Sequence, residues 1–467
     1  MPTAVLRNLW SLTGLPAQAL HWAAVPGADP VLPSSFRVGA AAQASMAAAA
    51  LAASELGHAR GQERQRVVVD MTHAALECTS WFSLDGQVPP MWDKFSGLYP
   101  TADGHVRIHA NFAHHRDGAL GLLDLDAAHA EKADVARRLA GWRAIDFESA
   151  AAEAGMVVAA LRSFDEWDVT PPAQAVAAQP VFHIERIGDA DPLPLTALGA
   201  NDLPLSGLCV LDLTRILAGP VATRALAAYG ADVMMVSSPR LPHIAAVADT
   251  SRGKRSCFAD LRTAGGRDAL QKLVQGAHVF VQGYRPGGLA ARGFGAEELA
   301  RQRPGIVAVS LNAYGPQGPW AARRGFDSLV QTAMGFNHAE GEAAGAGEPR
   351  ALPMQILDYA SGQLMALAAA AAVHRQQHEG GSWHVQVSLA QTGQWLRGLG
   401  RVAGGFDAAR HDIAPYIDTQ SSGFGELGFV RHAVQLERTP ARHARLAMPP
   451  GSHAPQWGEA VVSSTIR

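Results

Sequence analysis

Asp358 is the carboxylate best placed for chemistry in this chain. It follows a short apolar segment, 356–357, and precedes an alanine-rich stretch that predicts a helix over roughly 359–374. A carboxylate at such a junction faces the unpaired N–H groups of the first helical turn, which stabilise negative charge. Two interpretations follow. Asp358 either caps the helix, as aspartate commonly does, or has a chemical role that other segments of the chain must indicate.

A cluster of cations is the second chemical feature. Arg252, Lys254 and Arg255 lie within the segment 250–256. Clustered Arg and Lys side chains suit phosphate groups, which accept several charge-assisted hydrogen bonds. The same composition also fits a solvated loop, so the cluster by itself leaves both interpretations open.

The elements that must position these residues follow a βαβ rhythm. Between 205 and 312, strand-like runs at 208–213, 233–236, 278–282 and 306–311 alternate with helical stretches. Gly219 and Pro220 open a helix after the first run, and Gly230 closes it. We therefore expect an α/β fold with a Rossmann-like, doubly wound parallel sheet and a smaller α+β domain. The turn after the first strand lacks Gly-x-Gly-x-x-Gly, and the second strand ends without the acidic residue that binds a ribose diol, so we expect no NAD or FAD site there.

An ordered series of motifs over about 203–400 closely resembles the family III CoA-transferases, of the formyl-CoA and carnitine CoA-transferase type. The segments that carry the resemblance are 205–220, 228–233, 252–256, 281–287, 313–319, 324–327, 331–335 and 356–362. The resemblance implies transfer of CoA from an acyl-CoA to a carboxylic acid. It also implies that Asp358 is the nucleophile and forms a covalent aspartyl intermediate.

The resemblance further implies where coenzyme A binds. The residues expected to contact it are Arg215, Ala218, Gly219, Arg240, Arg252, Lys254, Arg255, Arg285 and Arg324. Gly283 departs from the pattern, because family members often carry Asn there, and one hydrogen bond to the cofactor is then missing. Acyl-CoA and a small carboxylic acid are the expected ligands.

An internal repeat divides the chain. The segment 65–75 parallels 383–391, and each follows an alanine-rich helix and a polar turn. The first copy has 37–41 where the second has Asp358, and it offers no carboxylate. We predict a partial repeat over 1–90 packing on the main sheet, and a small domain with its return linker over 91–200. A CoA-binding and catalytic domain over 201–400 and a C-terminal tail over 401–467 complete the division, with 187–204 crossing between lobes.

The amino-acid composition indicates which binding partners and which cellular environment to expect. The 467 residues carry a net charge of −3, which gives no broad electrostatic case for nucleic acid or acidic membranes. The alanine-rich stretches at 40–53 and 366–373 are too short to span a bilayer and predict buried helices. Three separated cysteines and no evident signal peptide fit a reducing cytoplasm. By analogy with the family, we expect a homodimer.

Three alternatives stay open at this stage. His105, His109, His114 and His115 lie near Asp117, but their spacing favours strand and loop histidines over a metal site, so no metal is expected. A racemase of the same family needs a His and Asp pair, and Phe326 stands where that His would be. A non-catalytic CoA-binding homologue would explain the rearranged order and the empty first copy.

Overall fold

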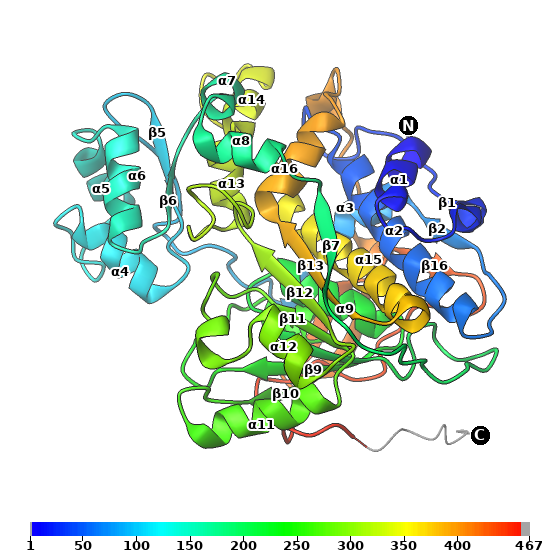
Figure 1. The fold of residues 1–467 in the computed structure, drawn as a ribbon. Coiled ribbons are helices and arrows are strands. Elements are labelled where there is room, and N and C mark those ends of the chain that lie inside the picture. The colour runs from blue at the N-terminus through cyan, green and yellow to red at the C-terminus, as the bar shows by residue number, and fades with distance from the viewer. Residues whose placement is uncertain (1, 459–467) are drawn as a thin grey trace.

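A seven-stranded sheet lies at the centre of the protein (Figure 1). The structure is a computed structural model that describes residues 2–458. The strands, in spatial order, are β10 (Lys254–Phe258), β9 (Asp232–Ser237), β8 (Cys209–Leu213), β11 (Val279–Gln282), β12 (Val307–Asn312), β13 (Ser382–Ser388) and β7 (Phe182–Gly188). All pair in parallel except β7, which runs antiparallel to β13. The predicted doubly wound parallel sheet is confirmed.

Alternate residues of the strands face opposite helical layers. On β8, Val210 joins the core with α9 (Ala218–Ala228) and α15 (Ile356–Glu379), whereas Leu211 joins a second core with α11 (Ala264–Gln275) and α12 (Ala296–Gln302). Because both sets of alternate residues face an apolar core, a strand buried on both faces is a continuous apolar run in the sequence.

Two strands of this sheet were not predicted. The sequence of 250–256 gave no strand prediction, yet Lys254 and Arg255 begin the edge strand β10. Strand β7 lies in the stretch assigned to the small domain and its return linker, so a boundary near residue 200 does not separate that domain from the sheet. Both strands lie at an edge of the sheet and contain polar residues, so neither shows the continuous apolar run of a strand buried on both faces.

The N-terminal part packs on α15 without entering the main sheet. It comprises α1 (Pro2–Ser11), η1 (Ala17–Trp22), β1 (Ala23–Ala24), α2 (Val38–Ala59), β2 (Val67–Val69) and α3 (Met71–Glu77). Helix α2 lies against α15, and both are buried, as expected for the two alanine-rich stretches. Helix α15 is also long and apolar enough to span a bilayer by composition, but its apolar window lies wholly inside the protein.

Two three-stranded sheets connect the first ninety residues with the C-terminal part. Strand β2 pairs with β1 and with β16 (Val434–Leu436), and β3 (Phe82–Leu84) pairs with β15 (Gly425–Val430), which pairs with β14 (Ile417–Ser422). The predicted tail therefore completes the N-terminal sheets. Strand β2 thus lies in a sheet with β1 and β16, whereas its counterpart in the second repeat unit, β13, lies in the seven-stranded sheet.

The two predicted repeat units begin their helices in the same way. The residues before α2 and α15, Arg37 and Gln355, both have φ −80, with ψ 56 and 61. Asp29 accepts a hydrogen bond from the N–H of Ala40 at 3.2 Å, and Asp327 accepts one from the N–H of Asp358 at 2.9 Å. Ala40 and Asp358 are each the third residue of their helix. The shared local geometry is clear, while the repeat as a relationship stays a prediction.

The small domain is an antiparallel sheet covered by three helices. Its strands are β4 (Gly97–Pro100), β5 (His105–Ile108) and β6 (Val158–Ala160), and its helices are α4 (Ala113–Gly121), α5 (Lys132–Leu139) and α6 (Ala144–Glu153). It has a core of its own. The remaining helices are α7 (Phe164–Asp168), α8 (Pro171–Ala177), α10 (Val247–Thr250), α13 (Asp327–Met334), α14 (Phe336–Ala343) and α16 (Leu389–Gly398).

Candidate active site

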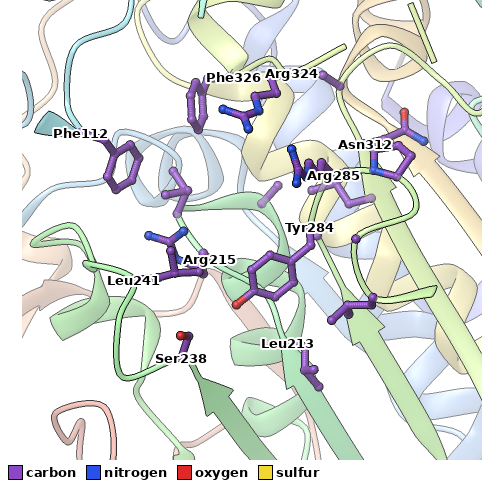
Figure 2. A pocket seen from close by; sticks show the side chains of 18 of the residues that line it. Phe112, Leu213, Arg215, Ser238, Leu241, Tyr284, Arg285, Asn312, Arg324 and Phe326 are labelled. Carbon is purple, nitrogen blue, oxygen red and sulfur yellow. The ribbon is translucent and has the colours of Figure 1, made fainter. Parts of the chain in front are cut away.

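A cavity of about 530 Å³ opens where the parallel strands end (Figure 2). Residues at or just beyond the carboxyl ends of β8, β9, β11 and β12 line it, among them Leu213, Ser238, Tyr284 and Asn312. The chain order reverses between β8 and β11, and such a switch point leaves a crevice in open α/β sheets. The small domain of the same chain forms the opposite wall, through residues such as Phe112 and Val157.

Asp358 lies in this cavity and does not cap its helix. It is the third residue of α15, after the cap residue Gln355, and its side chain is only 9% exposed. The capping function belongs to Asp327, whose Oδ2 accepts the N–H of Asp358 at 2.9 Å. The interpretation of Asp358 as an N-cap is therefore wrong, and its carboxylate is left free to face the cavity.

The electrostatic setting of Asp358 disfavours its charge. Burial and the neighbouring Asp327 carboxyl raise the pKa of Asp358 well above its ordinary value, and the main-chain N–H of Ala218 opposes this shift. Burial likewise raises the pKa of Asp327, against the N–H of Asp358 and the small-domain cation Arg107. A carboxylate that has lost its water and has one N–H donor beside it is poorly stabilised, which favours its attack on an electrophile.

The turn from β8 to α9 brings that N–H to the carboxylate. Ile216 in this turn has φ +75, a left-handed conformation that costs a β-branched residue of the order of 1–3 kcal/mol. Ala218 is the first residue of α9, and the first N–H groups of a helix have no partner within it. Gly362, one turn after Asp358, allows the close approach, because a Cβ there would lie 2.5 Å from the carbonyl oxygen of Ala218.

Arginine side chains dominate the polar lining. The arginines that line the cavity are Arg215, Arg240, Arg262, Arg285, Arg292, Arg323 and Arg324. The two aspartates on the lining are Asp358 and Asp260, and Asp260 is already paired with Arg240 at 3.2 Å and Arg262 at 2.8 Å. The cavity therefore carries an excess of positive charge suited to an anionic ligand. Of the predicted CoA contacts, Arg215, Ala218, Arg240, Arg285 and Arg324 lie on it.

The basic cluster at 252–255 lies elsewhere, which corrects the expectation of a phosphate site. Arg252 is 1% exposed, pairs with Asp249 at 2.7 Å and lies over the ring of Phe429. Lys254 is fully buried against Asp212. None of the three cations lines the cavity.

The other two predicted contacts have structural explanations. Arg255 pairs with Asp232 on the neighbouring strand β9. Gly219 is absent from the lining of the cavity and packs against Thr214 in the turn before α9, where a Cβ would collide with the threonine side chain. Asp249, Asp212 and Asp232 thus pair with Arg252, Lys254 and Arg255, and these charges are not available to a ligand.

The small domain contributes an aromatic wall that sequence reasoning missed. His109 stacks on Phe326 with ring centroids 4.0 Å apart, and Phe112 and His115 pack beside them. Burial lowers the pKa of His109 to about 3 and that of His115 to about 4, so both rings are neutral at pH 7. No group of three or more potential metal ligands occurs among residues 2–458. A signal for this wall was present in the four clustered histidines and Phe112 of 105–115.

Asp327 is the other site residue that the sequence analysis did not single out. It entered only as part of the motif 324–327, yet its carboxylate caps α15 and perturbs Asp358. Two carboxylates 31 residues apart carry no spacing signal that predicts their proximity.

Comparison with known proteins identifies the central part of the chain. The profile of CoA-transferase family III matches residues 205–402. An acyl-CoA transferase of Gibberella moniliformis is 29% identical over 77% of this chain and 70% of its own length. A probable fatty acyl-CoA transferase of Mycobacterium tuberculosis is 31% identical over 45% of this chain and 58% of its own length. The human succinyl-CoA:glutarate CoA-transferase is 33% identical over 35% and 39% of the two chains.

Solved structures show similar partial coverage. A CAIB/BAIF family protein from Brucella suis is 29% identical over 48% of this chain and 65% of its own, with a TM-score of 0.38. The matched part of the chain thus spans 70% of the Gibberella relative, 58% of the Mycobacterium relative and 39% of the human relative. Residues 205–402 thus carry the sequence pattern of CoA-transferase family III.

Proposed function

We propose that this protein transfers CoA between an acyl-CoA and a carboxylic acid, with Asp358 as the nucleophile. The observation that carries the proposal is the free, desolvated carboxylate of Asp358 in a cavity rich in arginine, with the N–H of Ala218 beside it. The match of residues 205–402 to CoA-transferase family III supports it.

The proposed chemistry begins with attack of one Asp358 oxygen on the thioester carbonyl carbon. The carbonyl electron pair moves to oxygen, and the resulting oxyanion collapses to expel CoA thiolate and leave an aspartyl mixed anhydride. The thiolate then attacks the aspartyl carbonyl carbon, which releases the first acid as a carboxylate and forms an aspartyl-CoA thioester. The acceptor carboxylate repeats these two steps in reverse, so that Asp358 is regenerated and no proton or redox partner is consumed.

The residues on the cavity fit the proposed ligand. Arg240, Arg262 and Arg285 supply planar cations for the phosphate groups of CoA. The N–H of Ala218 lies at the start of α9 beside Asp358, where it can stabilise an oxyanion. Relatives are named for succinate, glutarate and oxalate, and we propose small carboxylic acids as the acyl groups here. A homodimer in the cytoplasm, with neither NAD nor metal as cofactor, completes the proposal.

Mass spectrometry of the trapped enzyme tests the mechanism. The protein is incubated with acetyl-CoA or succinyl-CoA, quenched in acid and digested, and the peptide containing Asp358 is examined for the mass of CoA. We expect the adduct on Asp358 in the native protein and none in Asp358→Ala, which should fold normally. Transfer activity that survives in Asp358→Ala, or an adduct on another residue, would refute the assignment.

Two rival functions give different results in the same preparation. A non-catalytic homologue, favoured by the unusual order of segments, would bind acyl-CoA without forming any adduct or exchanging acids. A racemase would exchange the α-proton of a 2-methylacyl-CoA in D₂O. Phe326 occupies the position expected for one base of that reaction and stacks on His109, whose low pKa of about 3 leaves it a weak base.

A further inference from the structure

A buried ion pair lies directly beneath the turn that leads to Ala218. Lys254 on β10 and Asp212 on β8 both have fully buried side chains, and their Nζ and Oδ2 atoms are 2.9 Å apart. Lys254 also donates to the carbonyl oxygen of Pro220 at 2.9 Å and to Oγ1 of Thr223 at 2.7 Å. All three N–H donors of the ammonium group therefore have an acceptor.

The acceptor side of the pair is equally saturated. Oδ1 of Asp212 accepts from the N–H of Thr214 at 3.0 Å and from its hydroxyl at 2.5 Å. Oδ2 accepts from the hydroxyl of Thr223 at 2.6 Å. The pair thus holds the residue that begins the turn, Thr214, together with Pro220 and Thr223 on α9, and each part of the network is hydrogen-bonded.

Between these anchored ends lies the strained part of the chain. Ile216 has its positive φ of 75 here, and Leu217, with φ −138 and ψ −64, is also outside the helical region. A strained conformation persists only where surrounding contacts determine it. Apolar residues in place of a buried ion pair would serve stability about as well, but they would not fix the directions of Thr214 and Pro220 through hydrogen bonds.

We propose that the Asp212–Lys254 pair is a positioning device that locks the turn between β8 and α9, so that the N–H of Ala218 points at the carbonyl oxygen formed at Asp358. The inference rests on the proposed function. The pair touches no substrate and acts only through the turn. Its contribution is therefore to the tetrahedral oxyanions of the transfer steps, and not to the binding of CoA.

The decisive variant removes both charges together, as Asp212→Asn with Lys254→Met. Loss of one oxyanion donor costs about 10²–10³ in kcat, and we expect a loosened donor to lower kcat at least about tenfold. KM for the acyl-CoA should stay within about twofold, because the arginines that face the ligand are untouched. Thr223→Val, which keeps both charges, serves if the double variant does not fold, and should lower kcat about fivefold, the weight of one hydrogen bond.

Arg60→Met is the matched control. Arg60 is a buried cation, 5% exposed, that donates to the carbonyl oxygens of Thr196 at 2.9 Å and Ser206 at 2.7 Å, and it does not line the cavity. Its loss should lower the melting temperature and leave kcat within about twofold. If buried cations act only on stability, the double variant and Arg60→Met should change the melting temperature and kcat in the same way. If the 212–254 pair positions the turn, kcat should fall in the double variant and not in Arg60→Met.

Hydrogen exchange gives a readout that does not depend on turnover. The peptide covering 214–222 should exchange its amide hydrogens faster in the double variant than in the native protein, and at an unchanged rate in Arg60→Met. If the native protein transfers CoA but the folded double variant keeps its kcat, or if exchange of 214–222 is unaltered, the inference is overturned. Failure of the native protein to transfer CoA would instead overturn the proposed function.

Discussion

Gly362→Ala tests whether the distance between α9 and Asp358 governs activity. Gly362 lies one turn after Asp358 on α15, on the face that packs against α9. A Cβ at this position would lie 2.5 Å from the carbonyl oxygen of Ala218 and 2.9 Å from a methyl carbon of Val221. Neither contact can be relieved by a rotamer change of a long side chain, since one atom belongs to the backbone and the other to a β-branched residue.

The expected change in the free energy of unfolding of Gly362→Ala follows from two opposing effects. Replacing glycine by alanine within a helix stabilises it by about 1 kcal/mol, whereas overpacking a dense core costs about 1–3 kcal/mol. We expect a net loss of about 0–2 kcal/mol in the free energy of unfolding, so the variant should fold. To restore ordinary contact, the start of α9 must move by roughly 1 Å, and a misplacement of that size can lower a rate about 100-fold.

The assay compares kcat for CoA transfer with stability in urea, using Gly398→Ala as control. Gly398 ends α16, and a Cβ there would meet nothing within 4 Å. The control should be as stable as the native protein or slightly more so, with full activity. If Gly362→Ala folds and retains kcat within about threefold, the close approach of Ala218 to Asp358 has no catalytic importance and the reasoning fails.

Two further predictions concern charge. Because burial and Asp327 raise the pKa of Asp358 above its ordinary 3.8, ionisation of Asp358 destabilises the fold increasingly as pH rises above about 4. Asp358→Asn should therefore be inactive yet more stable than the native protein at pH 7, and urea titrations should show this difference in stability shrinking towards pH 4. A difference in stability that is independent of pH would contradict the burial argument. Arg285→Ala should raise KM for acyl-CoA about tenfold or more, the free energy of a charge-assisted hydrogen bond. Arg255→Ala should leave KM unchanged, because the Arg255 side chain pairs with Asp232 away from the cavity. Equal effects of the two variants on KM in steady-state kinetics would support the original prediction that the cluster at 252–255 binds phosphate.

Local sequence was sufficient to predict four central strands of the sheet and to single out Asp358 as the candidate nucleophile. The apolar runs at 208–213, 233–236, 278–282 and 306–311 predicted four central strands to within one residue at each end, because a strand buried on both faces must be apolar throughout. The motif at 356–362 singled out Asp358, and the spacing of Asp358 and Gly362 places both on one face of a helix.

Tertiary structure alone decided which charges are free to act. Lys254 and Arg285 look alike in sequence, but Asp212, 42 residues before Lys254, neutralises that lysine in the core, while Arg285 stays on the cavity. Likewise, the carboxylate that caps α15 belongs to Asp327, 31 residues before Asp358, and not to Asp358 itself. The partner of a buried charge is set by how distant segments pack, and the free energy of burying that charge depends on the partner, so neither can be read from the neighbouring residues.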